Sequence, residues 1–434
     1  MALEKNRGRV PQKGELVVIV GAGRSGQACA ELLASKGVTV RLLERDPEAL
    51  SPSQQAELRA KGIELLLGPH AKSHFAGATM IVPSPGMPVS ALAEYLETPD
   101  GAPEILSELE LAYRYLDNEP VLAITGTSGK TTTASLAASM LKAQGYLVFL
   151  GGNIGTPLSE YLLSGRKADV LVLECSSFQL QGCTTFCPRV AVLLNISPNH
   201  LDHHRDMAEY AEAKFRIFRC QDESDLAILG PGLEKIAASY SIPGRKLVLS
   251  ESSQFDAIRL PGKHNALNAE AAWQAARFFG VSLDNAKKAA AAFAPLPHRL
   301  ETVGERAGVT YVNDSKCTTV AALKVALEAF DRPVRLLAGG KFKGGDLAAL
   351  APLVREKVRE VALFGDSREY FEQAWAGIVP ISWHPTLREA VARLRGGAAR
   401  GDVILLAPAT SSYDLYKNYM ERGDDFRRIV SDLA

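Results

Sequence analysis

The residues best suited to chemistry form the stretch GTSGKT, residues 126–131, which follows a short apolar run at residues 121–125. A strand that enters a glycine turn and then a helix is the setting in which backbone N–H groups wrap a phosphate. We expect Lys130 to reach the terminal phosphates and Thr131 to offer its hydroxyl to Mg²⁺. The loop departs from the usual GxxxxGK(S/T) spacing, because only two residues separate its two glycines. The alternative is a plain strand-to-helix turn with a solvated lysine.

A second glycine motif, GAGRSG at residues 21–26, follows the apolar run at residues 16–20. Glu44 lies about 20 residues further on, where a dinucleotide-binding fold places a ribose partner. Three interpretations stay open: NAD binding, a pyrophosphate at a helix N-terminus, or a tight turn. The second phosphate loop downstream disfavours an oxidoreductase.

These motifs need strands and helices to position them, and short apolar runs alternate with amphipathic stretches along most of the chain. This pattern predicts an α/β protein with parallel sheets covered by helices. The expected strands are residues 16–20, 38–43, 79–84, 121–125, 169–174 and 189–197, with four more in VTYVNDS, VRLLAGG, VALFG and DVILLAP. We expect helices over residues 27–37 and 265–293. The two prolines in residues 295–301 predict a hinge.

The length of 434 residues exceeds one ordinary core and fits two or three domains. The succession of predicted strands and helices favours three. The predicted boundaries give an N-terminal Rossmann-like domain at 1–103, a central P-loop ATPase-like domain with a parallel or mixed sheet at 104–298, and a C-terminal Rossmann-like domain at 299–434.

Composition narrows the class of partner. The 49 basic residues balance 49 acidic ones, so no net charge favours a nucleic-acid partner. No apolar stretch approaches the roughly 18 residues of a membrane span, and the N-terminal apolar run enters a glycine turn and not a cleavage site. The six cysteines lack the spacing of a disulfide scaffold, and Cys183 and Cys187 lack a second pair that would complete a zinc site. We expect reduced, buried or half-buried thiols in a cytoplasmic, monomeric protein.

Ordered motifs lie across the central and C-terminal parts of the chain. They are GTSGKTT, GGNIGTP (151–157), LECSSFQL (173–180), LLNISPNHLDHH (193–204), GKHNALNA (262–269), LPHR (296–299) and NDSKCTT (313–319). Together they resemble the motifs of the Mur ligases. VPSPG (82–86), SSFQL and the tail APATSSYDLYKNYMERGDDF (407–426) are similar to the family branch that adds D-glutamate. The resemblance is specific because so many motifs occur in the same order, whereas any one of them alone would not indicate the family.

The resemblance implies an ATP-dependent acid–D-amino-acid ligase of cytoplasmic peptidoglycan precursor synthesis. ATP would phosphorylate the alanyl carboxylate of UDP-N-acetylmuramoyl-L-alanine, and the amine of D-glutamate would attack the acyl phosphate, leaving ADP and phosphate. Two anions approach each other in the first step, so metal and lysine charge are needed to screen them.

The resemblance also implies a metal site. Glu174 and His200 match family Mg²⁺ ligands beside Thr131, and Lys214 matches a lysine that CO₂ converts to a carbamate, an anion able to order or hold the metal. Together with Lys130 these form the expected catalytic set. Without the resemblance, a strand-end glutamate is more often a surface or capping residue, a single histidine more often structural, and a lysine on an amphipathic helix usually solvated.

The remaining expected ligands fall into three groups. For ATP they are the loop residues Gly126, Thr127, Ser128, Gly129, Lys130, Thr131 and Thr132, with Asn265, Asn268, Arg299 and Asp314 by resemblance. For the D-glutamate carboxylates they are Lys316, Lys343, Ser412 and Tyr419, which supply cations and hydroxyl donors; the alternatives are surface lysines and a packed tyrosine. For the UDP end they are Arg24, Ser25 and Asn153. Thr319 and Tyr419 depart from the Asn and Phe common in the family.

Other functions compete with this one. A folylpolyglutamate synthase-like ligase shares the phosphate loop but gives no reason for the GAGRSG domain. A NAD-dependent oxidoreductase would bind nicotinamide and need no ATP. A nucleotide-binding module without catalysis would tolerate alanine at Glu174, His200 and Lys214.

Overall fold

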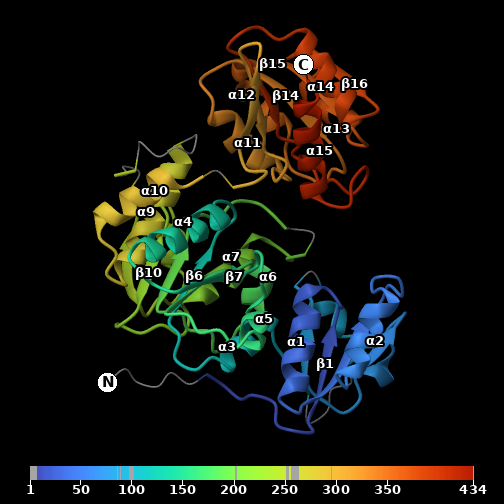
Figure 1. The fold of residues 1–434 in the computed structure, drawn as a ribbon, viewed down its shortest axis with the longest axis vertical. Helices are drawn as coiled ribbons and strands as arrows, with labels where there is room; N and C mark the ends of the chain where they lie inside the picture. The colour runs from blue at the N-terminus through green and yellow to red at the C-terminus, as the bar shows by residue number, and fades with distance from the viewer. Residues whose placement is uncertain are drawn as a thin grey trace. The chain divides into compact units, whose positions relative to one another are not determined.

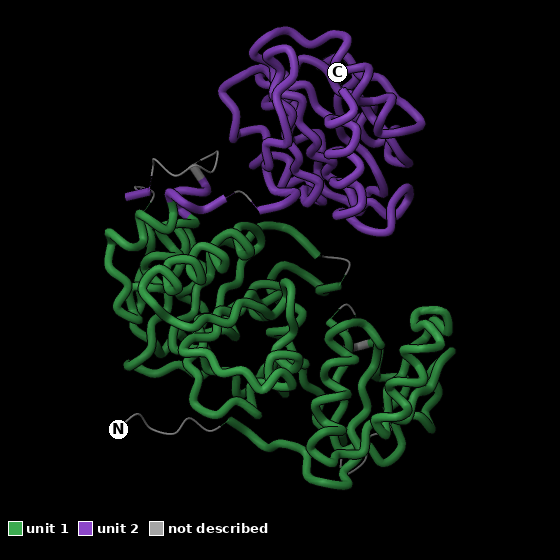
Figure 2. The backbone as a smooth tube through the Cα atoms, viewed as in Figure 1, with its two compact units in different colours: residues 1–253, 268–290 green, residues 254–267, 291–434 purple. Residues whose placement is uncertain are grey.

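The computed structural model describes residues 7–85, 87, 89–96, 102–200, 203–250, 254–255, 263–294 and 296–433. The motif positions Gly86, Leu201, Asp202, Gly262 and Pro295 lie outside these ranges. The chain divides into two compact units, residues 1–253 with 268–290 and residues 254–267 with 291–434 (Figure 2). The two units are described separately below.

The N-terminal sheet is parallel, with the order β3-β2-β1-β4-β5 among the described residues. Its strands are β1 (Leu16–Val20), β2 (Thr39–Glu44), β3 (Glu64–Leu67), β4 (Ala78–Pro83) and β5 (Glu104–Ile105), and its helices are α1 (Arg24–Ser35) and α2 (Pro52–Ala60), with short 3₁₀ turns at Lys72–His74 and Val89–Leu92. Val17 to Val20 are almost fully buried, as the continuous apolar run of a sheet covered on both faces requires.

The second sheet, also parallel, has the order β11-β10-β9-β6-β8-β7 in the described part of the chain. Its strands are β6 (Val121–Thr125), β7 (Val148–Gly152), β8 (Val170–Glu174), β9 (Val190–Leu193), β10 (Leu226–Leu229) and β11 (Arg245–Val248). The helices of this region are α3 (Glu108–Arg114), α4 (Lys130–Ala143), α5 (Leu158–Leu163), α6 (Ser177–Gln181), α7 (Met207–Phe215), α8 (Glu234–Ala237), α9 (Lys263–Arg277) and α10 (Leu283–Ala292), with a 3₁₀ turn at Arg216–Phe218. Helix α4 contacts β6, β7 and β8, and Figure 1 shows it beside β6.

The order of this sheet decides what its loops can meet. β6 pairs with β8 on one side and with β9 on the other. Because the three strands are parallel, their carboxyl ends, Thr125, Glu174 and Leu193, lie at one edge of the sheet. The loops that leave this edge therefore form one neighbourhood, as expected where α/β sheets bind ligands.

The third sheet is mixed, with the order β12-β13-β17-β14-β15-β16 among the described residues. Its strands are β12 (Glu301–Arg306), β13 (Val309–Asn313), β14 (Val334–Gly339), β15 (Val358–Phe364), β16 (Ile381–His384) and β17 (Val403–Leu406). Its helices are α11 (Val320–Glu328), α12 (Ala351–Lys357), α13 (Arg368–Trp375), α14 (Leu387–Gly396) and α15 (Tyr419–Ser431), with a 3₁₀ turn at Ala348–Leu350. β12 pairs antiparallel with β13, and the other pairs are parallel.

The predicted α/β architecture in three domains is confirmed, and the predicted strands at residues 16–20 and 121–125 match β1 and β6 residue for residue. The domain boundaries 1–103, 104–298 and 299–434 stay predictions. The predicted strand at 189–197 was too long, because β9 ends at Leu193 and the chain then turns toward the phosphate loop.

The predicted single helix over residues 265–293 is wrong. The chain forms α9 and α10, separated at residues 278–282. Gly280 ends the first helix with φ +89°, and Val281 N–H donates to the Ala276 carbonyl in a Schellman-type closure. The alanine-rich sequence on both sides of Gly280 favoured one continuous helix, so the sequence did not reveal where the first helix ends.

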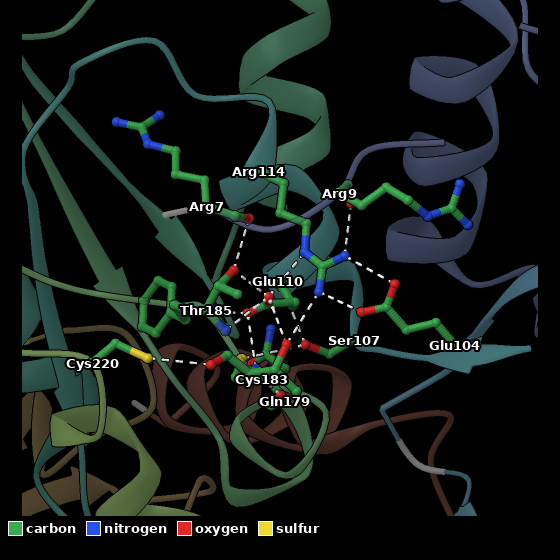
Figure 3. Close-up of polar contacts among 12 residues, drawn as sticks. Arg7, Arg9, Glu104, Ser107, Glu110, Arg114, Gln179, Cys183, Thr185 and Cys220 are labelled. Atoms are coloured by element: carbon green, nitrogen blue, oxygen red, sulfur yellow. Dashed lines mark hydrogen bonds and ion pairs between the residues drawn. The ribbon is translucent and has the colours of Figure 1, made fainter. Parts of the chain in front are cut away.

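α3 joins the first two sheets and carries a buried ionic network (Figure 3). The Glu110 carboxylate, with a fully buried side chain, accepts hydrogen bonds from Arg114 Nε at 3.0 Å and from the backbone N–H groups of residues 184–186. Arg114 in turn donates to Glu104 and to the carbonyl of Arg9. The network thus ties the N-terminal segment to the loop after α6.

No helix in the described ranges combines the length and apolar character that crossing a membrane requires.

Candidate active site

The phosphate loop runs from β6 into α4, and its two glycines have backbone conformations that other residues rarely adopt. Gly126 has φ +153° and Gly129, the N-cap of α4, has φ +82°. A Cβ on Gly129 would lie 2.4 Å from the Asn268 side-chain oxygen. Space and conformation therefore both require glycine at this position.

The chain after β9 braces this loop. Thr127 N–H donates to the Asn195 carbonyl at 3.0 Å, and Ser128 N–H donates to Asn195 Oδ1 at 2.9 Å. Thr127 Oγ1 accepts from Ser197 N–H at 3.0 Å and lies 3.0 Å from the Tyr210 hydroxyl. The loop is thus held by side chains as well as by its own turn, which favours a preorganised anion site.

Lys130 and Thr131 stand at the start of α4, as predicted. Lys130 Nζ donates to the carbonyls of Gly126 at 2.8 Å and Thr127 at 3.1 Å, so the ammonium lies over the loop itself. Thr131 Oγ1 donates to Glu174 Oε2 at 2.7 Å. The predicted partnership of Thr131 with Glu174 is therefore a direct contact.

Glu174 ends β8 with its side chain buried, and its second oxygen accepts from Asn153 Nδ2 at 2.7 Å. Asn153 was predicted to bind the UDP substrate, yet its amide here orients the glutamate. A hydroxyl and a carboxylate in contact form a hard oxygen donor set of the kind that Mg²⁺ prefers, so these residues fit the implied metal. Among the described residues, no three His, Cys, Asp or Glu side chains gather into a metal site.

His200 lies in the segment between β9 and α7. Its φ is +57°, a left-handed conformation uncommon for a residue with a Cβ. Its ring meets Phe178 edge-on at a centroid distance of 4.8 Å and lies 6.4 Å from the Tyr210 ring. An aromatic cluster therefore surrounds this predicted metal ligand.

Lys214 near the end of α7 is buried, although a lysine on such a helix is usually solvated. Its Nζ donates to the Gly126 carbonyl at 3.0 Å and lies 4.6 Å from the centre of the Tyr210 ring. Burial, followed by the nearby Lys130 charge, lowers the pKa of Lys214 well below its usual value. The fold thus brings both lysines against the phosphate loop.

The predicted ATP residues outside the loop divide between the two units. Asn268 in α9 lies against Gly129, and Asn265, also in α9, is buried. Asp314 in the second unit is buried and accepts from Leu300 N–H at 3.3 Å. Burial raises the pKa of Asp314 to about 7, while the charge of Arg299 lowers it. A role of these residues in ATP binding stays a prediction.

The predicted D-glutamate residues all belong to the C-terminal unit. The Lys316 ammonium lies 3.9 Å from the centre of the Tyr419 ring, and the Lys343 ammonium lies 5.4 Å from that of Tyr413. Ser412 is buried, and its carbonyl accepts from Tyr416 N–H. Lys316 and Tyr419 are therefore neighbours, and Tyr419 starts α15.

The GAGRSG loop opens α1 in the N-terminal sheet. The carboxylate of Glu44 accepts from Ala22 N–H at 2.8 Å, so it bonds to the loop's own backbone. Arg24 donates to both oxygens of Glu160 at 2.9 Å and to the Gly155 carbonyl at 2.7 Å. Arg24 thus contacts the GGNIGTP region, and Ser25 follows it in the first turn of α1.

The chain is 64% identical to the UDP-N-acetylmuramoylalanine–D-glutamate ligase of Desulfovibrio desulfuricans over 436 residues, covering all of both chains. The ligase of the same name from Nitratidesulfovibrio vulgaris strain DP4 is 59% identical over 435 residues, again covering all of both.

The chain belongs to the Mur ligase family. The MurD-like N-terminal domain of that family matches residues 15–96, the Mur ligase middle domain residues 124–238, and the glutamate ligase domain residues 298–410. Each match contains one of the three sheets in large part.

Solved structures agree at the level of the fold. A pseudomurein peptide ligase type C from Methanothermus fervidus has a TM-score of 0.59 at 19% identity, covering 97% of this chain and 100% of its own. The MurF ligase of Thermotoga maritima, solved with ADP, has a TM-score of 0.60 at 19% identity, covering 91% and 96%. The fold expected from the Mur ligase resemblance is confirmed.

Asn195 and Tyr210 contribute to the site although sequence reasoning did not select them. Asn195 lay within a predicted strand, and Tyr210 looked like one apolar residue of an amphipathic helix. Asn195 stands inside LLNISPNHLDHH, so its polar side chain at the end of an apolar run was the available signal. Tyr210 carried no comparable signal.

Proposed function

We propose that this Mur ligase family member joins D-glutamate to UDP-N-acetylmuramoyl-L-alanine in peptidoglycan precursor synthesis, converting ATP to ADP and phosphate. The observation that carries the proposal is the 64% identity over the whole chain to a UDP-N-acetylmuramoylalanine–D-glutamate ligase. The contacts among Lys130, Thr131, Glu174 and Lys214 support it, because they gather the charge that phosphoryl transfer needs.

In the first step of this reaction an alanyl carboxylate oxygen bonds to the γ-phosphorus of ATP and the bond to ADP breaks. Loop N–H groups would hold the phosphates, and Lys130 would leave its carbonyl partners for the phosphate oxygens. Thr131, Glu174 and His200 would hold Mg²⁺, which supplies positive charge that screens the two approaching anions.

In the second step the amine nitrogen of D-glutamate bonds to the acyl carbon, phosphate departs, and the nitrogen loses a proton. Lys316, Lys343, Ser412 and Tyr419 would bind the two carboxylates of D-glutamate. The cation–π contact of Lys316 with Tyr419 supports this, since it restrains the direction of a flexible ammonium.

The other assignments belong to the same proposal. Asn265, Asn268, Arg299 and Asp314 complete the ATP site, and Arg24, Ser25 and Asn153 serve the UDP substrate. Asn153 would act partly through Glu174, which its amide contacts. The domains would be 1–103, 104–298 and 299–434, in a monomeric cytoplasmic enzyme.

A carbamate on Lys214 is also proposed. Burial and the nearby Lys130 charge favour the uncharged amine, which is the form that attacks CO₂. The nitrogen–carbon bond forms as one proton leaves, and the resulting anion would offset the positive charge of Lys130.

The test is phosphate release from ATP with UDP-N-acetylmuramoyl-L-alanine, alone and with D-glutamate, L-glutamate or D-alanine. We expect release with D-glutamate only. Lys130→Ala should abolish it, whereas Lys142→Ala, which removes an exposed lysine from the same helix, should not. Equal activity of the Lys130→Ala enzyme and the parent would refute the proposal, and release with a folate and L-glutamate instead would favour a folylpolyglutamate synthase-like ligase.

A further inference from the structure

The segment between β9 and α7 carries His200 and is fixed at its start to the phosphate loop. Asn195 bonds to Thr127 and Ser128, and Ser197 N–H donates to Thr127 Oγ1 at 3.0 Å. Beyond these bonds the chain leaves the sheet edge. The position of His200 therefore depends on what holds the far end of the segment.

His204 provides a second anchor, near the far end of this segment. Its side chain is 1% exposed, and its Nε2 lies 2.9 Å from the Oγ of Ser177, itself buried. Ser177 is the first residue of α6 and follows Glu174 by three positions. The hydrogen bond therefore connects the His200 segment to the element that directly follows Glu174.

His204 also fixes the His200 backbone. The N–H groups of His204 and His203 donate to the His200 carbonyl at 2.9 Å and 3.1 Å. His200, whose carbonyl accepts both bonds, has a left-handed φ of +57°. Because a residue with a Cβ disfavours that conformation, the surrounding contacts must hold it.

Aromatic rings pack against both His204 and His200. The His204 ring stacks on Phe178 at a centroid distance of 5.6 Å and an interplanar angle of 21°, and it lies 5.2 Å from Tyr210. The Phe178 and Tyr210 rings also lie beside the His200 ring. Figure 1 shows the helices that carry them, α6 and α7, side by side.

We propose that His204 is a positioning residue for His200. Through its ring nitrogen it fixes the turn to Ser177, so that the His200 imidazole is held for the metal site that also includes Glu174. This inference rests on the proposed function, because His200 has a metal role only in that reaction. It assigns to His204 no contact with substrate.

The role of a positioning residue predicts how much its replacement should weaken metal binding. Residues that orient metal ligands through hydrogen bonds typically change metal affinity or activity by about 10- to 100-fold when they are replaced. A residue that only fills space would instead lower thermal stability and leave metal binding of the folded protein unchanged.

The experiment measures Mn²⁺ binding by electron paramagnetic resonance, with the full-length protein, a non-hydrolysable ATP analogue and UDP-N-acetylmuramoyl-L-alanine. We expect His204→Ala and Ser177→Ala each to weaken Mn²⁺ binding by about tenfold or more, and the double variant to add little further loss. His204→Gln should recover most of the affinity, because its amide can reach the Ser177 hydroxyl. In turnover, the Mg²⁺ concentration for half-maximal rate should rise while the KM for D-glutamate stays constant.

The control is His203→Ala, which removes a half-buried neighbour that packs on the same Phe178 ring at 4.1 Å. It should bind Mn²⁺ like the parent. Parent-like Mn²⁺ affinity in Ser177→Ala or in His204→Ala overturns the inference, and the Ser177 variant decides the matter if the histidine variant does not fold. Absence of D-glutamate-dependent phosphate release in the parent enzyme would instead refute the proposed function, while Mn²⁺ binding would still test the role of His204.

Discussion

At the scale of single residues, the site depends on polar groups that are buried and bonded to one another. Glu174 contacts Thr131 and Asn153, and Lys214 contacts the Gly126 carbonyl. Each of these side chains therefore has a hydrogen-bond partner, which offsets the penalty for removing it from water. The residues are therefore oriented before substrate arrives, which favours electrostatic catalysis.

Lys214 allows a pH prediction at this scale. Because burial lowers the pKa of Lys214, its amine becomes uncharged at a lower pH than that of a surface lysine. A carbamate should therefore form at a lower pH than on a surface lysine, and its population should rise with pH. Carbon NMR of protein in ¹³C-labelled bicarbonate should show one carbamate signal in the parent and in Lys142→Met, and none in Lys214→Met.

Turnover gives the second measurement for this residue. Lys214→Met should lower kcat by about 100-fold or more, because it removes the proposed carbamate anion beside the phosphate loop. A labelled signal that survives in Lys214→Met would place the carbamate on another lysine.

At the scale of secondary structure, the short helix α3 joins two sheets with two buried carboxylates. Glu110 bonds to Arg114 and to the loop after α6, and Glu108 accepts from Ser159 N–H in α5 at 2.7 Å. Charge pairing and hydrogen bonds make the burial of Glu110 tolerable, and a raised pKa that favours the neutral carboxyl does so for Glu108. α3 therefore links the two sheets through buried hydrogen bonds and an ion pair.

The Glu110 network predicts a large loss of stability. Glu110→Gln leaves the buried Arg114 guanidinium without its nearest buried anion, which we expect to lower the free energy of unfolding of the first unit by about 3 kcal/mol. Glu104→Gln removes a 36% exposed partner of the same guanidinium and should lower it by at most about 1 kcal/mol. Urea unfolding followed by circular dichroism compares the two, and an equal loss would contradict the assigned difference in burial.

The buried carboxyl of Glu108 predicts that the stability of the protein depends on pH. Burial raises the pKa of Glu108 above its ordinary 4.5, against the lowering effect of Ser159. The stability that its neutral form contributes is therefore complete below pH 4.5 and is lost as pH rises through the raised value. The melting temperature of Glu108→Gln should fall less with rising pH than that of the parent, whereas exposed Glu57→Gln should follow the parent. Parallel curves for the parent and Glu108→Gln would show that Glu108 ionises normally.

At the scale of the whole molecule, the chain has two compact units, each with buried strands of its own. The phosphate loop lies in the first unit, and Arg299 and Asp314 lie in the second. Separate cores favour separate unfolding transitions, so a single free energy does not describe the chain.

This division predicts that an ATP analogue acts mainly on one transition, because the phosphate loop lies in the first unit. Scanning calorimetry should resolve two transitions, and a non-hydrolysable ATP analogue should raise the one that belongs to the first unit. The stabilisation reaches about 2.7 kcal/mol at a hundredfold excess over Kd. Lys130→Ala should abolish the shift and leave the other transition in place. One cooperative transition in the ligand-free parent would count against independent units.

Much of the fold and of the phosphate loop could be read from local patterns. Apolar runs and glycine turns act between residues close in sequence, which is why β1, β6 and the start of α4 matched prediction. Local patterns also misled. Gly280 ended a helix that the alanine-rich sequence around it predicted to continue. Strand β12 pairs antiparallel with β13, whereas the apolar runs predicted parallel sheets and the prolines before β12 indicated only a hinge.

The site as an arrangement in space depended on contacts between distant segments. Lys214 meets Gly126 across 88 residues of sequence, and its burial cannot be inferred from its own helix. Strand order brings them together, because β6 lies between β8 and β9 and their loops leave the same edge. Residue types indicated the chemistry, while packing set which polar groups lost their water and which partners replaced it.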